Sequence, residues 1–488
     1  MKTITFLCVA FLLLGKANAT NTWILKNFPD SVTINGIATN SINEVFVTAY
    51  YWVEEEGDYW TVGIAYKSTD DGNTWEQIIH SEYFPSIMDI LIDIQDNIYL
   101  GTWYGGCIYK SVDHGNTWVS YESGLSNCVP ANLSINSEGV LYAGQEWGAG
   151  IDYSINGGET WQPTNHPSNG GVKGLGVSNN DYLFSDGGTY SSDGGNSWHT
   201  NDDGLSNVAL INSVRYAFNT NDEVFAGTVD GVYYLSSIDA SWAKILSTNG
   251  YILGLIITSQ NEVFAATNND VFYSANNGQD WENINNQFSD SKPRKFSFDK
   301  EGYLWAASEN QIYKSNAILT NIHTITVSVS PMGSGTVNGL VDFSHYYEEG
   351  KKVTLKAEPN TDYQFSGWTE NGVVVSNDKT YSFNAEEDRV LLANFEDTNT
   401  SATDKEENLV VLYPNPSNNL VTIRLSNNLS FDNTFAEIFN NHGKEIARIP
   451  INESTTVFDF SPHQAGIYYY RIKMNSISIQ SGTIFIVK

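Results

Sequence analysis

An eight-residue motif recurs along the first two thirds of the chain and limits its fold more than any other feature. The motif begins with Ser, has Asp or Asn at its third and Gly at its fifth position, and ends with Trp. Asp and Asn side chains bond to nearby backbone, Gly accepts a positive φ, and Trp packs between layers, so the motif predicts a tight turn leading into a strand. Close copies begin at Ser68, Ser111, Ser154 and Ser191, and a looser one begins at Ser274.

Two strand-like runs recur at the same spacing as this turn, and each occurs seven times. The first spans residues 43–50, 96–103, 139–146, 180–186, 222–228, 261–267 and 302–308. The second spans residues 63–68, 106–111, 150–154, 188–192, 231–236, 270–274 and 311–315. The Trp residues at positions 75, 118, 161, 198, 242 and 281 are 37 to 44 residues apart. This spacing is close to the ~40–50 residues of one β-propeller blade.

The seventh copy lacks the strand that should follow its last run. Thr22 to Leu25, near the N-terminus, matches the sequence that follows each turn, such as Thr74 to Gln77. We therefore predict an all-β chain in which residues 20–318 form a seven-bladed propeller, with an N-terminal strand closing the last blade. Ring closure would remove the exposed sheet edges that otherwise invite aggregation.

The motif resembles the Asp box of the Asp-box (BNR-like) repeat propellers, which include sialidases, xyloglucanases and sortilin-type receptors. In that superfamily the box lies at the turn between the third and fourth strands, on the face away from the active site. The resemblance therefore implies a structural role, not a catalytic one, for the repeated residues Asp70, Trp75, Asp113, Trp118, Asn156, Trp161, Asp193 and Trp198.

The repeat does not continue into residues 320–396, where apolar and polar residues alternate as in the strands of a small β module. The segments at 330–337, 347–350 and 363–372 resemble the divergent internalin B-repeat family, whose modules act as spacers or contact domains on bacterial surface proteins. Residues 397–408 are polar, without apolar periodicity, and are predicted to be a linker.

Residues 409–488 resemble the type A C-terminal sorting domain of the type IX secretion system. The Tyr-Pro-Asn-Pro start at Tyr413, the turn glycine Gly443, the Gly466-Ile-Tyr468 segment and the basic C-terminal end carry the resemblance. It implies a β-sandwich that the secretion translocon reads as an address and that is commonly cleaved. An ordinary sandwich that folds and stays is the alternative.

The N-terminal sequence indicates where in or outside the cell the protein is expected, and the net charge limits its partners. Residues 1–19 read as a signal peptide, with Lys2, the apolar run Phe6 to Leu14 and an Ala-x-Ala cleavage site ending at Ala19. No later run is long enough to span a membrane. Because the net charge is −31, nucleic acid is excluded as a partner. We expect secretion through the periplasm to the cell surface or the medium, where Cys107 and Cys128 could form a disulfide or remain two buried thiols.

Candidate ligand-binding residues gather in three neighbouring blades, on the loops between second and third strands. They are Tyr51, Trp52, Glu54 and Trp60 in the first blade, Trp103 and Tyr104 in the second, and Glu146 and Trp147 in the third. Aromatic rings beside carboxylates suit a sugar, because rings cover its apolar faces while carboxylates accept its hydroxyl groups. The rings could equally pack the long loop onto its blade. A glycoside hydrolase could use carboxylates such as Glu54, Glu55, Glu56 and Glu146.

Several enzyme classes are disfavoured. Sialidases of the superfamily use three arginines around the sugar carboxylate, but this propeller has only Arg215 and Arg294. No metal-binding or nucleophile motif is present, and no cofactor is expected. The sequence thus favours a non-catalytic protein that recognises a glycan or a protein. A secreted glycoside hydrolase and a propeller that helps to assemble other surface proteins are the alternatives.

Overall fold

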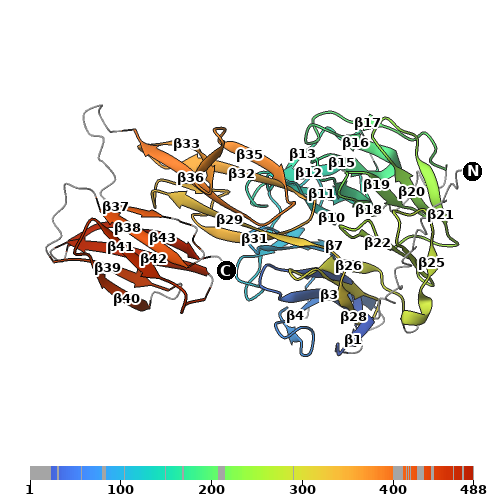
Figure 1. Cartoon of the computed structure of the whole chain (residues 1–488). Helices are drawn as coiled ribbons and strands as arrows, with labels where there is room; N and C mark the ends of the chain where they lie inside the picture. Colours follow the sequence, from blue (N-terminus) through green and yellow to red (C-terminus); the bar gives the residue numbers. More distant parts are fainter. Residues whose placement is uncertain are drawn as a thin grey trace, which may run out of the picture.

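The structure is a computed structural model that describes residues 23–486. Gaps in this range fall at 30–31, 56–57, 80–83, 104, 149, 168–169, 207–214, 289–290, 399–409, 414, 416, 418, 426–432, 441–443, 465 and 475–476. The predicted signal peptide and most of the predicted linker therefore lie outside the described residues. The architecture is all-β, as predicted, and the chain forms three units in a row (Figure 1).

Residues 23–318 form seven four-stranded antiparallel sheets, here called blades 1 to 7. From the innermost to the outermost strand, blade 1 has β2 (Thr33–Thr39), β3 (Val45–Glu55), β4 (Asp58–Ser68) and β5 (Glu76–Gln77); blade 2 has β6 (Ser86–Ile92), β7 (Ile98–Trp103), β8 (Ile108–Ser111) and β9 (Val119–Tyr121); blade 3 has β10 (Pro130–Ile135), β11 (Leu141–Gln145), β12 (Ile151–Ser154) and β13 (Gln162–Pro163). Blade 4 has β14 (Leu175–Val177), β15 (Leu183–Ser185), β16 (Thr189–Ser191) and β17 (His199–Thr200); blade 5 has β18 (Arg215–Phe218), β19 (Val224–Gly227), β20 (Gly231–Leu235) and β21 (Ala243–Ser247). Blade 6 has β22 (Gly254–Ile257), β23 (Val263–Ala266), β24 (Val271–Ser274) and β25 (Glu282–Asn283); blade 7 has β26 (Lys295–Phe298), β27 (Tyr303–Ala307), β28 (Ile312–Ile318) and β1 (Trp23–Lys26). Two short 3₁₀ turns are η1 (Asp186–Gly188) and η2 (Asn285–Gln287).

The inner strands form a ring, because each contacts the inner strand of the next blade and β2 contacts β26. Each blade repeats one core device. The first residue of the first repeated run (in blade 4 the second, Asp181) adopts a positive φ, which Asn, Asp and Gly tolerate best, and the residue three positions after it is a buried aromatic ring. Burying such a ring stabilises the fold by about 1.5–3 kcal/mol. The rings are Phe46, Tyr99, Tyr142, Phe184, Phe225, Phe264 and Trp305, all 0–2% exposed.

The N-terminal strand closes blade 7 as predicted, pairing antiparallel with β28 so that Trp23 lies opposite Ser315. The Trp23 ring packs 5.1 Å from Phe288 and 5.9 Å from Phe264, measured between ring centroids. Buried apolar contacts thus hold this strand in the last sheet.

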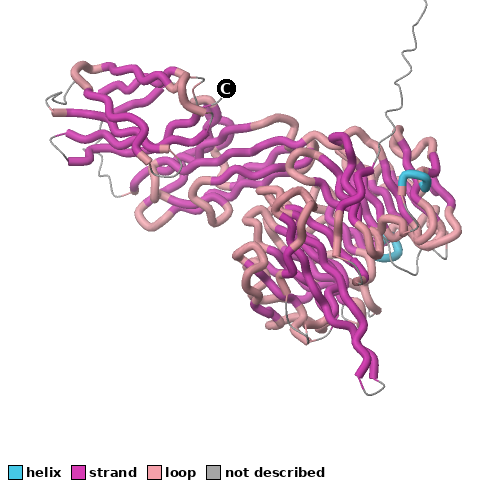
Figure 2. Tube along the Cα trace, turned by 90° about the horizontal axis from the view of Figure 1, so that it is seen from below, coloured by secondary structure: helices cyan, strands magenta, loops and turns pink. Residues whose placement is uncertain are grey.

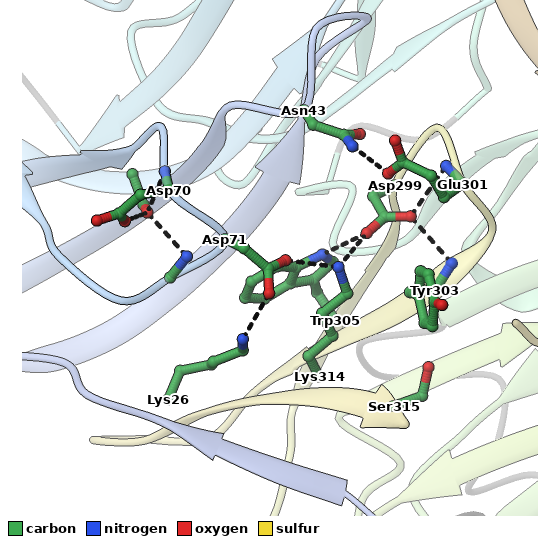
Figure 3. A network of polar contacts seen from close by, with 12 residues as sticks. Lys26, Asn43, Asp70, Asp71, Asp299, Glu301, Tyr303, Trp305, Lys314 and Ser315 are labelled. Carbon is green, nitrogen blue, oxygen red and sulfur yellow. Dashed lines mark hydrogen bonds and ion pairs between the residues drawn. The ribbon is translucent and has the colours of Figure 1, made fainter. Parts of the chain in front are cut away.

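A polar network crosses the junction between blades 7 and 1 (Figure 3). Asp71, in the first turn motif, accepts hydrogen bonds from Lys26 of β1 at 2.7 Å and from Lys314 of β28 at 2.6 Å. Lys314 also lies 2.9 Å from Asp299, which accepts a hydrogen bond from the Trp305 indole. The two lysine side chains are only 9% and 10% exposed, whereas the Asp71 side chain that joins them is 52% exposed, and the network ties the two ends of the ring together.

The eight-residue motif forms the turn between the third and fourth strands. In the first copy the Asp70 carboxylate accepts hydrogen bonds from the Thr74 amide at 2.8 Å and the Thr74 hydroxyl at 2.7 Å, and the Gly72 amide donates to the Ser68 hydroxyl at 2.9 Å. Equivalent bonds recur at Asp113, Asn156 and Asp193. The Ser197 hydroxyl and amide lower the pKa of Asp193 to about 2. These local bonds support the structural role expected for the motif.

The middle unit (residues 322–397) packs two sheets around Trp368, Leu355 and Leu391. One sheet has the order β31 (Phe343–Glu348), β29 (Ile322–Ser330), β36 (Arg389–Asp397), β33 (Tyr363–Glu370), β34 (Val373–Ser376), and the other has β30 (Gly335–Val337), β32 (Lys352–Pro359), β35 (Thr380–Asn384). The C-terminal unit (residues 410–486) is a sandwich of β37 (Val410–Tyr413), β38 (Leu420–Leu425), β41 (Thr455–Asp459) against β40 (Glu445–Pro450), β39 (Thr434–Phe439), β42 (Gly466–Met474), β43 (Ile477–Ile486).

The propeller has two faces that differ in what covers them. The back face carries the loops between first and second strands and the turn motifs, and the front face carries the loops between second and third strands and those joining successive blades. The middle unit lies against the back face: Lys352 pairs with Asp181 at 2.7 Å, and Gln95 donates to the Asn338 carbonyl at 2.9 Å. A cavity of about 680 Å³ remains between the two units. The front face thus stays opposite to the middle unit.

Candidate functional site

The predicted aromatic residues of blade 1 lie on a long hairpin of β3 and β4 that projects from the propeller (Figure 2). The strands stay paired out to Glu55 opposite Asp58, and side chains alternate between the two faces of the hairpin. Trp52 and Glu54 therefore share one face, whereas Tyr51 and Trp60 share the other. The Trp52 ring is 64% exposed and lies 6.4 Å from the Tyr50 ring. The structure divides this predicted cluster into two pairs.

The predicted tryptophans of blades 2 and 3 lie together. Trp103 ends β7 and Trp147 follows β11, and their ring centroids are 5.7 Å apart with planes at 85°. Trp147 is 53% exposed, and its carbonyl accepts a hydrogen bond from the Asn127 side chain at 2.6 Å. The edge-to-face arrangement leaves part of the Trp147 ring open to solvent. Tyr104, which follows Trp103, lies outside the described residues.

A disulfide joins the loops beside these rings. Cys107 precedes β8 of blade 2 and Cys128 precedes β10 of blade 3, and the structure links their sulfur atoms. Such a bond closing a 21-residue separation restrains the unfolded chain by about 3 kcal/mol in the loop-entropy account. It fixes the loop after Trp103 to the segment that holds Asn127, and therefore stiffens the surroundings of the tryptophan pair.

Glu146 places a carboxylate directly before Trp147. Its side chain is 17% exposed, and its Oε1 lies 4.0 Å from Nζ of Lys173, while its buried Oε2 has no hydrogen-bond partner among the described residues. The backbone of Gly171 passes so close that an added Cβ would lie 1.4 Å from the Glu146 carbonyl oxygen. Only glycine fits there, and this close approach brings the Lys173 segment beside Glu146.

Sequence reasoning missed a group of charged side chains on the inner strands. Lys295 of β26 lies 3.8 Å from Asp89 of β6, although blade 1 separates their blades along the ring. Arg215, the first residue of β18, donates from Nη1 to the Lys173 carbonyl at 3.3 Å. Burial lowers the pKa of Arg215 and of Lys295, and the charge of Asp89 opposes the shift in both. Arg215 and Lys295 are each the first residue of the innermost strand of a blade. This shared position is the only feature of the sequence that could have indicated them.

The family comparisons match the two C-terminal units. Residues 325–399 match the divergent InlB B-repeat domain family, and residues 411–487 match the secretion system C-terminal sorting domain family, so both predicted resemblances are confirmed. No curated protein matches the chain in sequence.

Solved structures similar to the chain include β-propellers. Virginiamycin B lyase from Staphylococcus aureus, solved with quinupristin, has a TM-score of 0.50 and 13% identity over 61% of this chain and 99% of its own. PorZ, a surface component of the type IX secretion system of Porphyromonas gingivalis, has a TM-score of 0.45 and 13% identity over 95% of this chain and 60% of its own. The extracellular domain of BT4673 from B. thetaiotaomicron has a TM-score of 0.45 and 13% identity over 96% of this chain and 60% of its own.

These findings establish the general nature of the chain. Across the part of the chain that the structure describes, no helix has the length and apolarity needed to cross a bilayer. The chain is an all-β protein with a propeller fold that carries a divergent InlB B-repeat domain and a C-terminal sorting domain, and the latter marks it for type IX secretion to the cell surface or beyond.

Proposed function

We propose that the chain is a non-catalytic recognition protein whose front face binds a glycan, with protein ligands as the alternative. The observation that carries the proposal is the Trp103–Trp147 pair, in which the Trp147 ring is half exposed; the carboxylate residue Glu146 directly precedes Trp147 in the chain. Pyranose rings present apolar C–H faces that pack on an aromatic ring, and their hydroxyl groups donate to carboxylates. The disulfide beside the pair supports preorganisation, which lowers the entropy lost on binding.

A glycan array with the purified chain tests this proposal. Trp147→Ala is expected to weaken binding of any glycan hit at least tenfold. Tyr251→Ala is the matched control, because Tyr251 is 50% exposed and precedes the first strand of blade 6, away from the pair. Trp52→Ala reports whether the projecting hairpin takes part. An array without hits, or hits indifferent to Trp147→Ala, would contradict the proposal.

The hydrolase alternative has one supporting observation, the unpartnered buried oxygen of Glu146. Reducing-end release should be measured on every array hit with the wild-type chain and with Glu146→Gln. We expect no release from either. Release that Glu146→Gln abolishes would replace recognition by glycoside hydrolysis. For the assembly alternative, capture of outer-membrane proteins that survives Trp147→Ala and competing glycans would favour a protein partner.

A further inference from the structure

The front face holds a guanidinium group with an unused edge. Arg215 donates from Nη1 to the backbone carbonyl of Lys173, whereas its Nε is buried and has no hydrogen-bond partner among the described residues. No hydrogen bond from Nη2 occurs among these residues either. The Nε and Nη2 hydrogens lie in one plane and point the same way, so together they form the fork that grips a carboxylate through two parallel bonds.

The neighbouring carboxylates do not fill this fork. Asp186 accepts a hydrogen bond from the Lys173 amide at 2.6 Å, which holds one of its oxygens on the backbone. Asp89 accepts from the Leu133 amide at 2.8 Å and faces Lys295 at 3.8 Å. Both carboxylates act on Arg215 through their charge, and burial still lowers the pKa of the guanidinium. A buried donor without an acceptor, such as the Arg215 Nε, costs free energy that a bound carboxylate would recover.

The Arg215 fork is connected to the tryptophan pair through Lys173. The Lys173 carbonyl receives the Arg215 bond at 3.3 Å, and the Lys173 ammonium lies 4.0 Å from Glu146, which precedes Trp147. Lys173, which precedes β14 of blade 4, thus links the Arg215 fork of blade 5 to blade 3, where Glu146 has a buried oxygen without a partner and Trp147 has an exposed ring. An acidic sugar offers the three matching groups: a carboxylate, hydroxyl donors and an apolar ring face.

We propose that the front face binds an acidic oligosaccharide, with the uronate carboxylate on the Nε–Nη2 edge of Arg215, a sugar hydroxyl on Glu146 and a sugar ring on Trp147. This inference rests on the proposed function and names its ligand class. The net charge of −31 favours short ligands with few carboxylates, because a densely charged polyanion would be repelled.

The test compares acidic oligosaccharides with their carboxyl-reduced counterparts, which keep the sugar rings but lose the charge. Binding of uronic-acid trisaccharides and of the reduced forms is measured by calorimetry for the wild-type chain, Arg215→Gln, Arg215→Lys and Arg294→Gln. Arg294→Gln is the matched control, because it removes an arginine that already pairs with Glu309 at 3.2 Å. Thermal unfolding of each variant shows that it folds.

The proposal expects the wild-type chain to prefer the acidic form and Arg215→Gln to weaken that form at least tenfold, leaving the reduced form unchanged. Arg215→Lys keeps the charge without the fork and is expected to weaken binding nearly as much, whereas Arg294→Gln changes it less than twofold. Equal binding of both forms, or equal losses in Arg215→Gln and Arg294→Gln, would overturn the carboxylate site but leave glycan recognition intact. Binding of neither form, with an empty array, would instead refute the proposed function.

Discussion

Single residues with positive φ precede the second strand in the blades of the propeller. Asn43, Asp96, Asp181 and Asp222 all have φ between 60° and 65°, and each lies two residues before the second strand of its blade. Some of them have a second task. The Asp96 carboxylate of blade 2 accepts hydrogen bonds from the Ser41 amide at 2.9 Å and hydroxyl at 2.6 Å, so it ties blade 2 to blade 1. One side chain thus serves both backbone geometry and blade packing.

Asp96→Ala should therefore destabilise the propeller by about 1–3 kcal/mol, because it strains the positive φ and leaves the Ser41 donors unpaired. Asp96→Asn keeps a residue that tolerates this φ and is expected to lose less. Urea unfolding followed by tryptophan fluorescence measures both. Equal stability of Asp96→Ala and the wild type would show that this contact adds nothing to the ring.

His166 is expected to make stability depend on pH. Burial lowers its pKa from 6.5 to about 4, and its Nε2 lies 2.9 Å from the Ser185 hydroxyl. The unfolded chain binds a proton at this site near pH 6.5 and the folded chain does not, so stability is full above pH 6.5 and falls as the pH drops towards 4. The free energy of unfolding at pH 7.5 and 4.5 should fall less in His166→Asn than in the wild type. Identical falls would exclude His166 as the cause.

Paired strands explain both what the sequence predicts well and what it misses. The turn motif and the two repeated runs predict which strands exist and how β1 closes blade 7, because Gly, Asp and Trp report local backbone geometry directly. The sequence predicts a loop around Trp52 and Trp60, yet this segment continues as paired strand to Glu55. Period-two alternation then sends the two tryptophans to opposite faces.

The charged group around Arg215 could not be predicted for a different reason. Asp89 and Lys295 are about 200 residues apart in sequence and meet only because seven inner strands curl into a ring. The Trp103–Trp147 pair, by contrast, lies on adjacent blades at equivalent loops, so repeat counting alone brings the two residues near each other. Predicting contacts across the ring requires the tilt of the strands and the directions of their side chains, and no local sequence pattern contains this information.

The closing strand depends on Asp71, which leads to a test at this scale. Burial raises the pKa of Asp71, but bonds from Lys26 and Lys314 outweigh it and the net pKa is lowered. Asp71→Asn tolerates the positive φ of 60° yet leaves two largely buried lysines with less compensation. We expect a loss of about 1–3 kcal/mol in denaturant unfolding at pH 7.

The loss should shrink as the pH falls below about 4, since the wild-type carboxylate then becomes protonated as well. Asp58→Asn, at the exposed end of the hairpin, removes the same charge without a lysine partner and serves as control. If both variants lose equally, general charge effects account for the result.

At the scale of the whole molecule, the middle unit and the propeller are joined by polar contacts. The Lys352 ammonium meets Asp181 at 2.7 Å, and the Ser137 and Thr354 hydroxyl oxygens lie 2.6 Å apart. Asp181 also accepts hydrogen bonds from Ser137, so this one carboxylate connects two blades and the middle unit. The contacts couple the orientation of the two units.

Lys352→Glu should separate the two units, because it places a carboxylate against Asp181. We expect small-angle scattering to report a larger radius of gyration and calorimetry to resolve an additional transition. Lys356→Glu, on the same strand but 65% exposed at its side chain, makes the same charge change and should leave both readouts unchanged. A compact Lys352→Glu chain with an unaltered melting profile would show that other contacts suffice.

Because the middle unit covers the back face, the two faces of the propeller are not equivalent. The C-terminal unit continues the line from propeller to middle unit (Figure 1), so the chain leaves the ring on its covered side. The tryptophan pair lies on the opposite, uncovered face of the propeller, away from the units that lead to the sorting domain. A ligand wider than the propeller could therefore reach the pair without contacting the middle or C-terminal unit.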